Sequence, residues 1–101
     1  MADDEEYNAM QFSWDPKKAA VNAGKHRVTF DEAMTVFADA GAITAYDPEH
    51  SDNEDRFLTI GMSADGCVLF VSHTDRGDSI RIISARKADK QEREEYVDGN
   101  R

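Results

Sequence analysis

The sequence predicts an α+β domain, with an antiparallel sheet of four to five strands, two N-terminal helices and one C-terminal helix. Two observations support this prediction. Apolar residues recur at helical spacing up to about residue 39, whereas from residue 42 onward they alternate or form short continuous runs, as strands do. Strands that follow one another directly, with the helices kept apart from them, are typical of an antiparallel sheet packed against helices.

A short strand and a helix begin the domain. Residues 10–14 alternate apolar with polar side chains, as a half-buried strand does. Asp15 and Pro16 then start a helix that should run to about Lys25, because aspartate caps helices and proline suits their first position.

A second helix should follow and end near Asp39. Its start is predicted by Thr29 and Glu32, which have the spacing of a reciprocal capping box, in which each side chain accepts from the other residue's amide. Its buried face is predicted by apolar residues at helical spacing, which are Phe30, Ala33, Met34 and Phe37.

The second half of the chain should form the main part of the sheet. Strands are expected over residues 42–46, 56–62, 67–74 and 79–85. Polar turns separate them, at residues 47–54, 63–66 and 75–78. The run at 67–74 opens with five consecutive apolar residues, which predicts a central strand. Asp89 and Glu92 then predict the cap of a final helix that ends near Val97.

Length and composition favour one cytoplasmic domain. The 101 residues fit a domain over residues 10–98, preceded by a flexible acidic extension over residues 1–9. The N-terminus does not resemble a secretory signal, and no apolar run approaches the roughly 20 residues that span a bilayer. The one cysteine, Cys67, excludes an internal disulfide and lies in an apolar run, so we expect it in the core.

The net charge of −9 argues against broad affinity for nucleic acids, which attract a basic surface. A nucleic-acid substrate would therefore need a local cationic site.

Four segments resemble, in order and spacing, the motifs of one bacterial family. They are Phe12-Ser13-Trp14-Asp15-Pro16-Lys17-Lys18 with Asn22; Lys25-His26-Arg27-Val28-Thr29-Phe30-Asp31-Glu32-Ala33 with Val36-Phe37 and Asp39; Asp47, His50-Ser51, Glu54, Arg56 and Ile60-Gly61; and Arg81-Ile82-Ile83-Ser84-Ala85-Arg86 with Ala88, Glu92-Arg93 and Tyr96. The family is that of the BrnT toxins, and the resemblance covers about Gln11–Tyr96. One departure is Arg27, where the family has glycine. Because arginine resists a positive φ, we expect a reshaped turn there, with consequences for the placement of Lys25 and His26.

The resemblance implies a fold similar to that of RelE-type ribonucleases and an endoribonuclease that slows translation. It also implies a partner antitoxin of the BrnA type, in a complex that can hold two toxins and two antitoxins. Operator DNA would then be contacted only through the antitoxin. No membrane partner is implied.

RNA cleavage of this kind needs neither metal nor cofactor, because the 2′-hydroxyl of RNA can attack the adjacent phosphate. The protein then supplies a proton acceptor, a proton donor and positive charge on the phosphorane, and arginine suits the last task. The polar residues 47–54 lack the spacing of a calcium or zinc site and indicate a solvated turn.

The candidate site residues are cationic or aromatic side chains at strand ends and helix junctions. Candidate catalytic residues are Lys25, His26, His73, Arg76, Arg81 and Arg86. Candidate substrate-binding residues are Lys17, Arg56 and Tyr96. Alternation along the strand 79–85 predicts that Ile80 and Ile82 face the helices, while Arg81, Ile83 and Ala85 share the open face.

Structural roles remain open for most of these candidates. Arg56 follows Glu54 and Asp55 and is more simply explained as one half of an ion pair. Arg81 and Arg86 have equal claims to substrate phosphate and to a carboxylate partner. His73 has a simpler role at the end of a strand, and Trp14 one in the core. At the level of the whole protein, the alternatives are an inactive toxin-like module that only binds an antitoxin-like partner, and, less favoured, a DNA-binding regulator.

Overall fold

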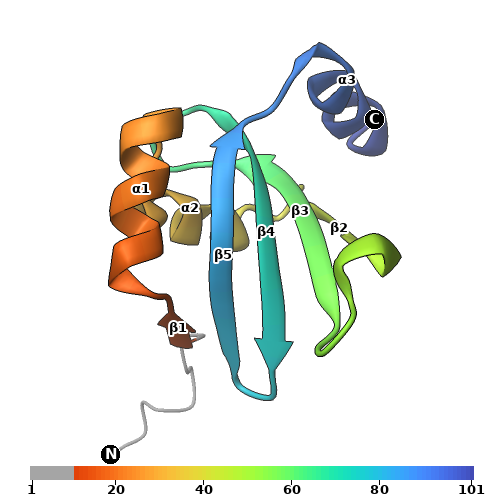
Figure 1. The fold of residues 1–101 in the computed structure, drawn as a ribbon. Coiled ribbons are helices and arrows are strands. Elements are labelled where there is room, and N and C mark those ends of the chain that lie inside the picture. Colours follow the sequence, from red (N-terminus) through yellow and green to blue (C-terminus); the bar gives the residue numbers. More distant parts are fainter. Residues whose placement is uncertain (1–10) are drawn as a thin grey trace, which may run out of the picture.

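A five-stranded sheet in the order β1-β5-β4-β3-β2 organises the fold (Figure 1). The computed structural model describes residues 11–101. The strands are β1 (Gln11–Ser13), β2 (Ile43–Tyr46), β3 (Arg56–Met62), β4 (Val68–Arg76) and β5 (Ser79–Lys87). Within this part of the chain, β1 runs parallel to β5 and the other pairs are antiparallel. The α+β prediction is confirmed, with β1 as a parallel addition at one edge.

The helices lie where the sequence places them. They are α1 (Pro16–His26), α2 (Phe30–Thr35) and α3 (Lys90–Gly99), with short 3₁₀ turns η2 (Val36–Ala38) and η3 (Pro48–His50). The second predicted helix is therefore α2 followed by a tighter turn, and α3 continues past the predicted end to include Gly99. The described helices are all too short to cross a bilayer. The predicted extension over residues 1–9 and the predicted domain start at residue 10 lie outside the described residues.

The helix starts confirm most of the capping predictions. Asp15 accepts from the Lys17 amide at 2.9 Å, and Thr29 accepts from the Glu32 amide at 3.0 Å. The reciprocal half of the Thr29 box was predicted wrongly, because the Glu32 carboxylate accepts from the Ser63 hydroxyl at 2.7 Å instead. This contact ties α2 to the turn between β3 and β4. A complete capping box forms at the start of α3.

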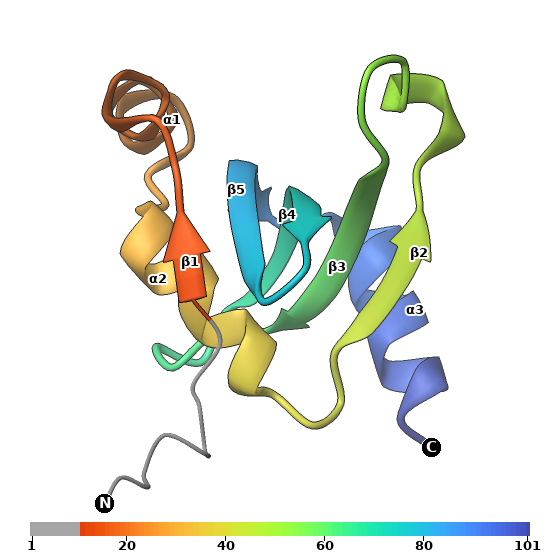
Figure 2. The same ribbon diagram turned by 90° about the horizontal axis from the view of Figure 1, so that it is seen from below.

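The core lies between one face of the sheet and α2. Its buried apolar members are Val28, Phe30, Ala33, Val36, Leu69, Val71, Ile80, Ile82 and Ala85. Trp14 and Cys67 pack against this core while keeping part of their surface exposed. Figure 2 shows α2 against this face, whereas α1 lies beside β5 at the border of the opposite face. We call the face opposite α2 the open face.

A β-bulge in β5 decides which side chains reach the open face. Ile83 has no partner on β4, so the alternation shifts by one residue at this point. Ala85 therefore joins Ile82 in the core, each 1% exposed, and the prediction that it shares a face with Arg81 was wrong. Because of the shift, Arg81 and Arg86 both lie opposite the core.

Asn22 of α1 replaces a missing strand at the edge of β5. β1 pairs only with the first three residues of β5, which leaves the Ala85 backbone without a strand partner on that side. The Asn22 amide donates to the carbonyls of Ala85 (2.8 Å) and Val28 (3.0 Å), and its oxygen accepts from the Ala85 amide (3.1 Å). Asn22 is 6% exposed, so these hydrogen bonds form away from water.

Arg27 ends α1 in the left-handed conformation, with φ 60° and ψ 29°. Its backbone amide donates to the Ala23 carbonyl at 3.0 Å, which completes the helix end. The chain therefore keeps the turn that glycine favours in spite of the arginine, and the expectation of a reshaped turn was wrong. Lys25 and His26 keep their place in the last turn of α1.

Candidate active site

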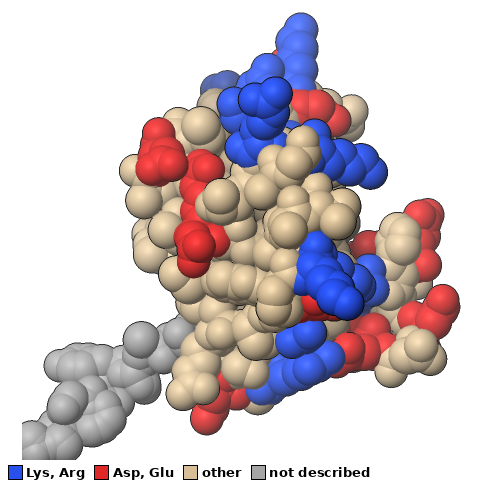
Figure 3. All heavy atoms as spheres, turned by 60° about the vertical axis from the view of Figure 1, so that its left-hand side comes forward, with Lys and Arg blue, Asp and Glu red and all other residues tan. Residues whose placement is uncertain are grey.

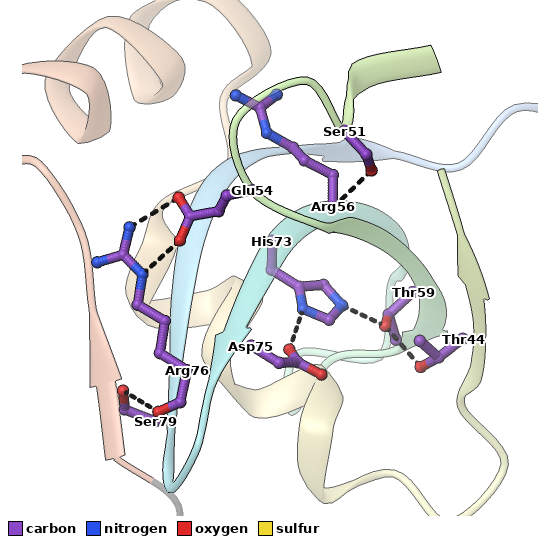
Figure 4. A network of polar contacts seen from close by, with 9 residues as sticks. All are labelled: Thr44, Ser51, Glu54, Arg56, Thr59, His73, Asp75, Arg76 and Ser79. Atoms are coloured by element: carbon purple, nitrogen blue, oxygen red, sulfur yellow. Dashed lines mark hydrogen bonds and ion pairs between the residues drawn. The ribbon is translucent and has the colours of Figure 1, made fainter. Parts of the chain in front are cut away.

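Three of the candidate arginines lie near one carboxylate. Arg76 donates two hydrogen bonds to the Glu54 carboxylate, of 2.8 and 2.9 Å (Figure 4). This contact holds the pKa of Glu54 below its usual value, and the nearby charges of Arg56 and Arg81 lower it further. One carboxylate thus stands among three guanidinium groups. Arg56, Arg76 and Arg81 are named the arginine cluster below.

Two members of the arginine cluster form no ion pair within residues 11–101. Arg56 is placed by its backbone amide, which donates to the Ser51 hydroxyl at 2.8 Å, and Figure 4 shows its guanidinium without a partner. The sequence favoured an ion pair for Arg56, beside Glu54 and Asp55, but Glu54 binds Arg76 instead. The Arg81 guanidinium contacts the Ser13 hydroxyl, at 3.4 Å. Both guanidinium groups are therefore available to an anion on the open face.

A second group of candidates lines a cavity of about 320 Å³ between α1 and β5. Lys17, Lys25 and His26 come from α1, and the bulged Ile83 supplies part of the other wall. In Figure 3, which views the molecule from the α1 side, Lys and Arg side chains gather along one margin of an uncharged centre, with some Asp and Glu among them and others on the opposite margin. Although the net charge of the protein is negative, basic side chains are therefore concentrated along one margin of this side of the molecule.

His73 lies apart from the arginine cluster, on the core face of β4. It is 1% exposed and is held by the Thr59 hydroxyl at 2.7 Å and the Asp75 carboxylate at 2.9 Å (Figure 4). Phe37 packs edge-on against the imidazole and Phe57 stacks on it. Burial lowers the pKa of His73, and Asp75 opposes this shift only in part. These surroundings favour the neutral form of the imidazole and indicate that His73 supports the fold.

The lowered pKa of His73 predicts a loss of stability in mild acid. Below about pH 6.5 the unfolded chain takes up a proton that the folded chain resists, so stability is complete above this pH and falls as pH drops toward the lower folded-state value. Urea unfolding from about pH 7.5 to about pH 5.5 should show this loss in the wild type and a smaller one in His73→Gln. Equal pH dependence in both proteins would contradict it.

Arg86 and Tyr96 lie where α3 is joined to the rest of the domain. Arg86 binds both carboxylate oxygens of Glu92, at 2.8 and 2.9 Å, and lies 4.2 Å from the centre of the Phe70 ring. Tyr96 donates to Asp39 at 2.7 Å, which raises the pKa of the tyrosine. The structure therefore brings neither residue into the arginine cluster and gives both of them contacts that fasten α3.

Sequence reasoning missed Thr74, which lies between two members of the arginine cluster. Thr74 pairs with Arg56 on β3 and with Arg81 on β5. The sequence signal was present in the strand pattern, but which residues lie opposite one another depends on the register between strands.

The fold and the site together define a small α+β protein with guanidinium groups gathered on the sheet face opposite α2. The sequence profile of the family described as "Ribonuclease toxin, BrnT, of type II toxin-antitoxin system" matches residues 14–92. The chain belongs to this family and is a ribonuclease toxin of a toxin–antitoxin system, which has an antitoxin as partner.

A solved structure supports the fold assignment. The chain resembles the crystal structure of the Brucella abortus ribonuclease toxin BrnT, with a TM-score of 0.59 and 22% sequence identity, over 81% of this chain and 100% of that one. No curated protein matches the chain. At this identity the resemblance establishes a shared architecture.

Proposed function

We propose that the chain cleaves RNA on the open face by attack of the 2′-hydroxyl on the adjacent phosphate, without a metal ion. The supporting observation is that Arg56 and Arg81, on β3 and β5, form no ion pair with a carboxylate of residues 11–101, while three guanidinium groups share the single nearby carboxylate of Glu54. Charge aimed at a developing phosphorane stabilises the transition state of this reaction. A local cluster also gives an acidic protein a way to bind RNA.

The proposed division of labour follows the geometry. Arg56 and Arg81 bind the phosphate, and Arg76 joins them when its exposed pair with Glu54 opens. Lys25 and His26, in the cavity beside β5, are the candidates for proton transfer, because histidine both accepts and donates protons near neutral pH. Lys17, at the opposite end of α1 from Lys25 and His26, would contact the RNA backbone where the cavity begins beside β1. His73, Arg86 and Tyr96 support the fold that holds these groups.

The same proposal includes the partner and the consequence. Cleavage of cytoplasmic RNA would slow translation, and an antitoxin of the BrnA type would silence the toxin. An acidic surface on that antitoxin would complement the arginine cluster and exclude RNA at the same time. Two toxins and two antitoxins would form the complex, and contact with operator DNA would come from the antitoxin.

The test uses purified full-length protein and one RNA oligonucleotide in two forms, unmodified and with 2′-O-methyl groups throughout. The unmodified RNA should be cut in the presence of EDTA, leaving a 2′,3′-cyclic phosphate and a 5′-hydroxyl, whereas the methylated RNA should stay intact. Cleavage that requires a divalent ion, or that also cuts the methylated RNA, would contradict the mechanism.

The alternative of an inactive binding module predicts a different result. Such a protein would bind the product of a neighbouring reading frame, yet would cut no RNA with or without ribosomes and would cause no growth arrest when expressed. Growth arrest that the neighbouring frame relieves would support the toxin proposal. The turn at Arg27 no longer favours the inactive module, because the left-handed conformation is retained there.

A further inference from the structure

The open face contains a buried hydroxyl without a hydrogen-bond partner. Thr74 is 1% exposed, and its Oγ1 has no partner among the described residues. Buried hydroxyl groups normally find a partner, because leaving one without a hydrogen bond is costly. A buried hydroxyl of this kind points to a ligand that supplies the missing hydrogen-bond partner.

The position of Thr74 indicates the chemistry of that ligand. Thr74 stands directly opposite Arg56 on one side and Arg81 on the other, and directly paired residues in a sheet project from the same face. The three side chains therefore form a row across β3, β4 and β5, with the hydroxyl in the middle. Two cationic groups that flank a neutral donor suit an anion with several oxygens, such as a phosphate group.

Thr59 shows that this feature is specific to one face. It is also a threonine of the central sheet and is 0% exposed, but it lies on the core face. Its hydroxyl is bonded to Thr44 and to His73, each at 2.7 Å. A buried threonine in this sheet is thus fully bonded where it supports the fold, and it lacks a partner where it faces the arginines.

We propose that Arg56, Thr74 and Arg81 form a phosphate-binding row, in which the Thr74 hydroxyl donates to a non-bridging oxygen of the phosphodiester. This inference deepens the proposed RNA cleavage and rests on it for the identity of the phosphodiester. The two arginines are only partly buried, so their side chains can swing outward to admit the phosphate. Thr74 would then fix the position of the phosphate while the arginines supply the charge.

The experiment measures affinity for a 2′-O-methyl RNA oligonucleotide, which binds without being cut, together with thermal stability. Thr74→Val should bind about tenfold more weakly, with an unchanged or higher melting temperature, because the variant removes an unbonded hydroxyl. Thr74→Ser should restore most of the affinity. Thr59→Val is the matched control and should lose stability while keeping its affinity where it remains folded.

The outcomes separate this inference from the proposed function. Wild-type affinity in Thr74→Val would overturn the role of the hydroxyl, whatever its effect on stability, and would leave RNA cleavage by the wild type standing. Oligonucleotide binding that depends on Thr74, in a protein that cuts no RNA, would support the row and refute the nuclease mechanism. Failure of the wild type to bind the oligonucleotide would overturn the row.

Discussion

Replacing Arg81 with alanine should lower the rate of RNA cleavage by about 10²–10³-fold, with little change in stability. The loss is that expected when one preorganised group that stabilises transition-state charge is removed. The fold should persist because the one hydrogen bond that the Arg81 side chain makes within the described residues is long, 3.4 Å to Ser13. Cleavage rates at saturating RNA, together with the melting temperature of each protein, measure both effects.

Arg86→Ala is the matched control for Arg81→Ala. It removes an arginine from the same strand and the same face, but one that binds Glu92 and lies over Phe70. We expect Arg86→Ala to loosen α3 and lower the melting temperature, while the folded protein continues to cut RNA. A well-folded Arg81→Ala with wild-type cleavage would remove Arg81 from the active site.

Asn22→Ala should lower the free energy of unfolding by about 3 kcal/mol, since a buried backbone group left without its partner costs roughly 1–3 kcal/mol. The variant leaves three backbone groups without their hydrogen-bond partner, namely the amide and carbonyl of Ala85 and the carbonyl of Val28. Urea denaturation of both proteins at one pH measures the difference.

Asn100→Ala provides the control for Asn22→Ala. Its amide also makes two hydrogen bonds to backbone carbonyls, those of Gly41 (3.0 Å) and Tyr96 (2.7 Å), but the side chain is exposed. Water can replace these bonds, so the loss should stay below about 1 kcal/mol. Equal losses in the two variants would show that burial of Asn22 contributes nothing special.

The sequence predicted well those features that local chemistry determines. Asp15 and Thr29 begin helices because their side chains reach amides two or three residues away. The range predicted for one strand, residues 56–62, is also that of β3. Polar residues before this segment and a turn after it mark both of its ends. The order of helices and strands followed from these signals alone.

Features that depend on pairing between strands escaped prediction. The bulge at Ile83 shifts the alternation of β5, so strict alternation misplaced Ala85. His73 was expected at an accessible strand end, but β4 continues to Arg76 and the imidazole lies on the core face. The ion-pair partner of Glu54 could not be predicted either, because Glu54 binds an arginine 22 residues away rather than the nearby Arg56.

The bulge also sets a rule for changes in chain length within β5. Losing Ile83 would restore plain alternation and leave Ile82, Ala85 and Arg86 each on its present side, at the cost of one wall residue of the cavity beside α1. Losing a residue farther from the bulge would invert the stretch of β5 between the deletion and the bulge, or the strand end beyond the deletion, and so turn a guanidinium inward or an apolar group outward. The bulge is therefore where we expect relatives to differ by one residue in the length of β5.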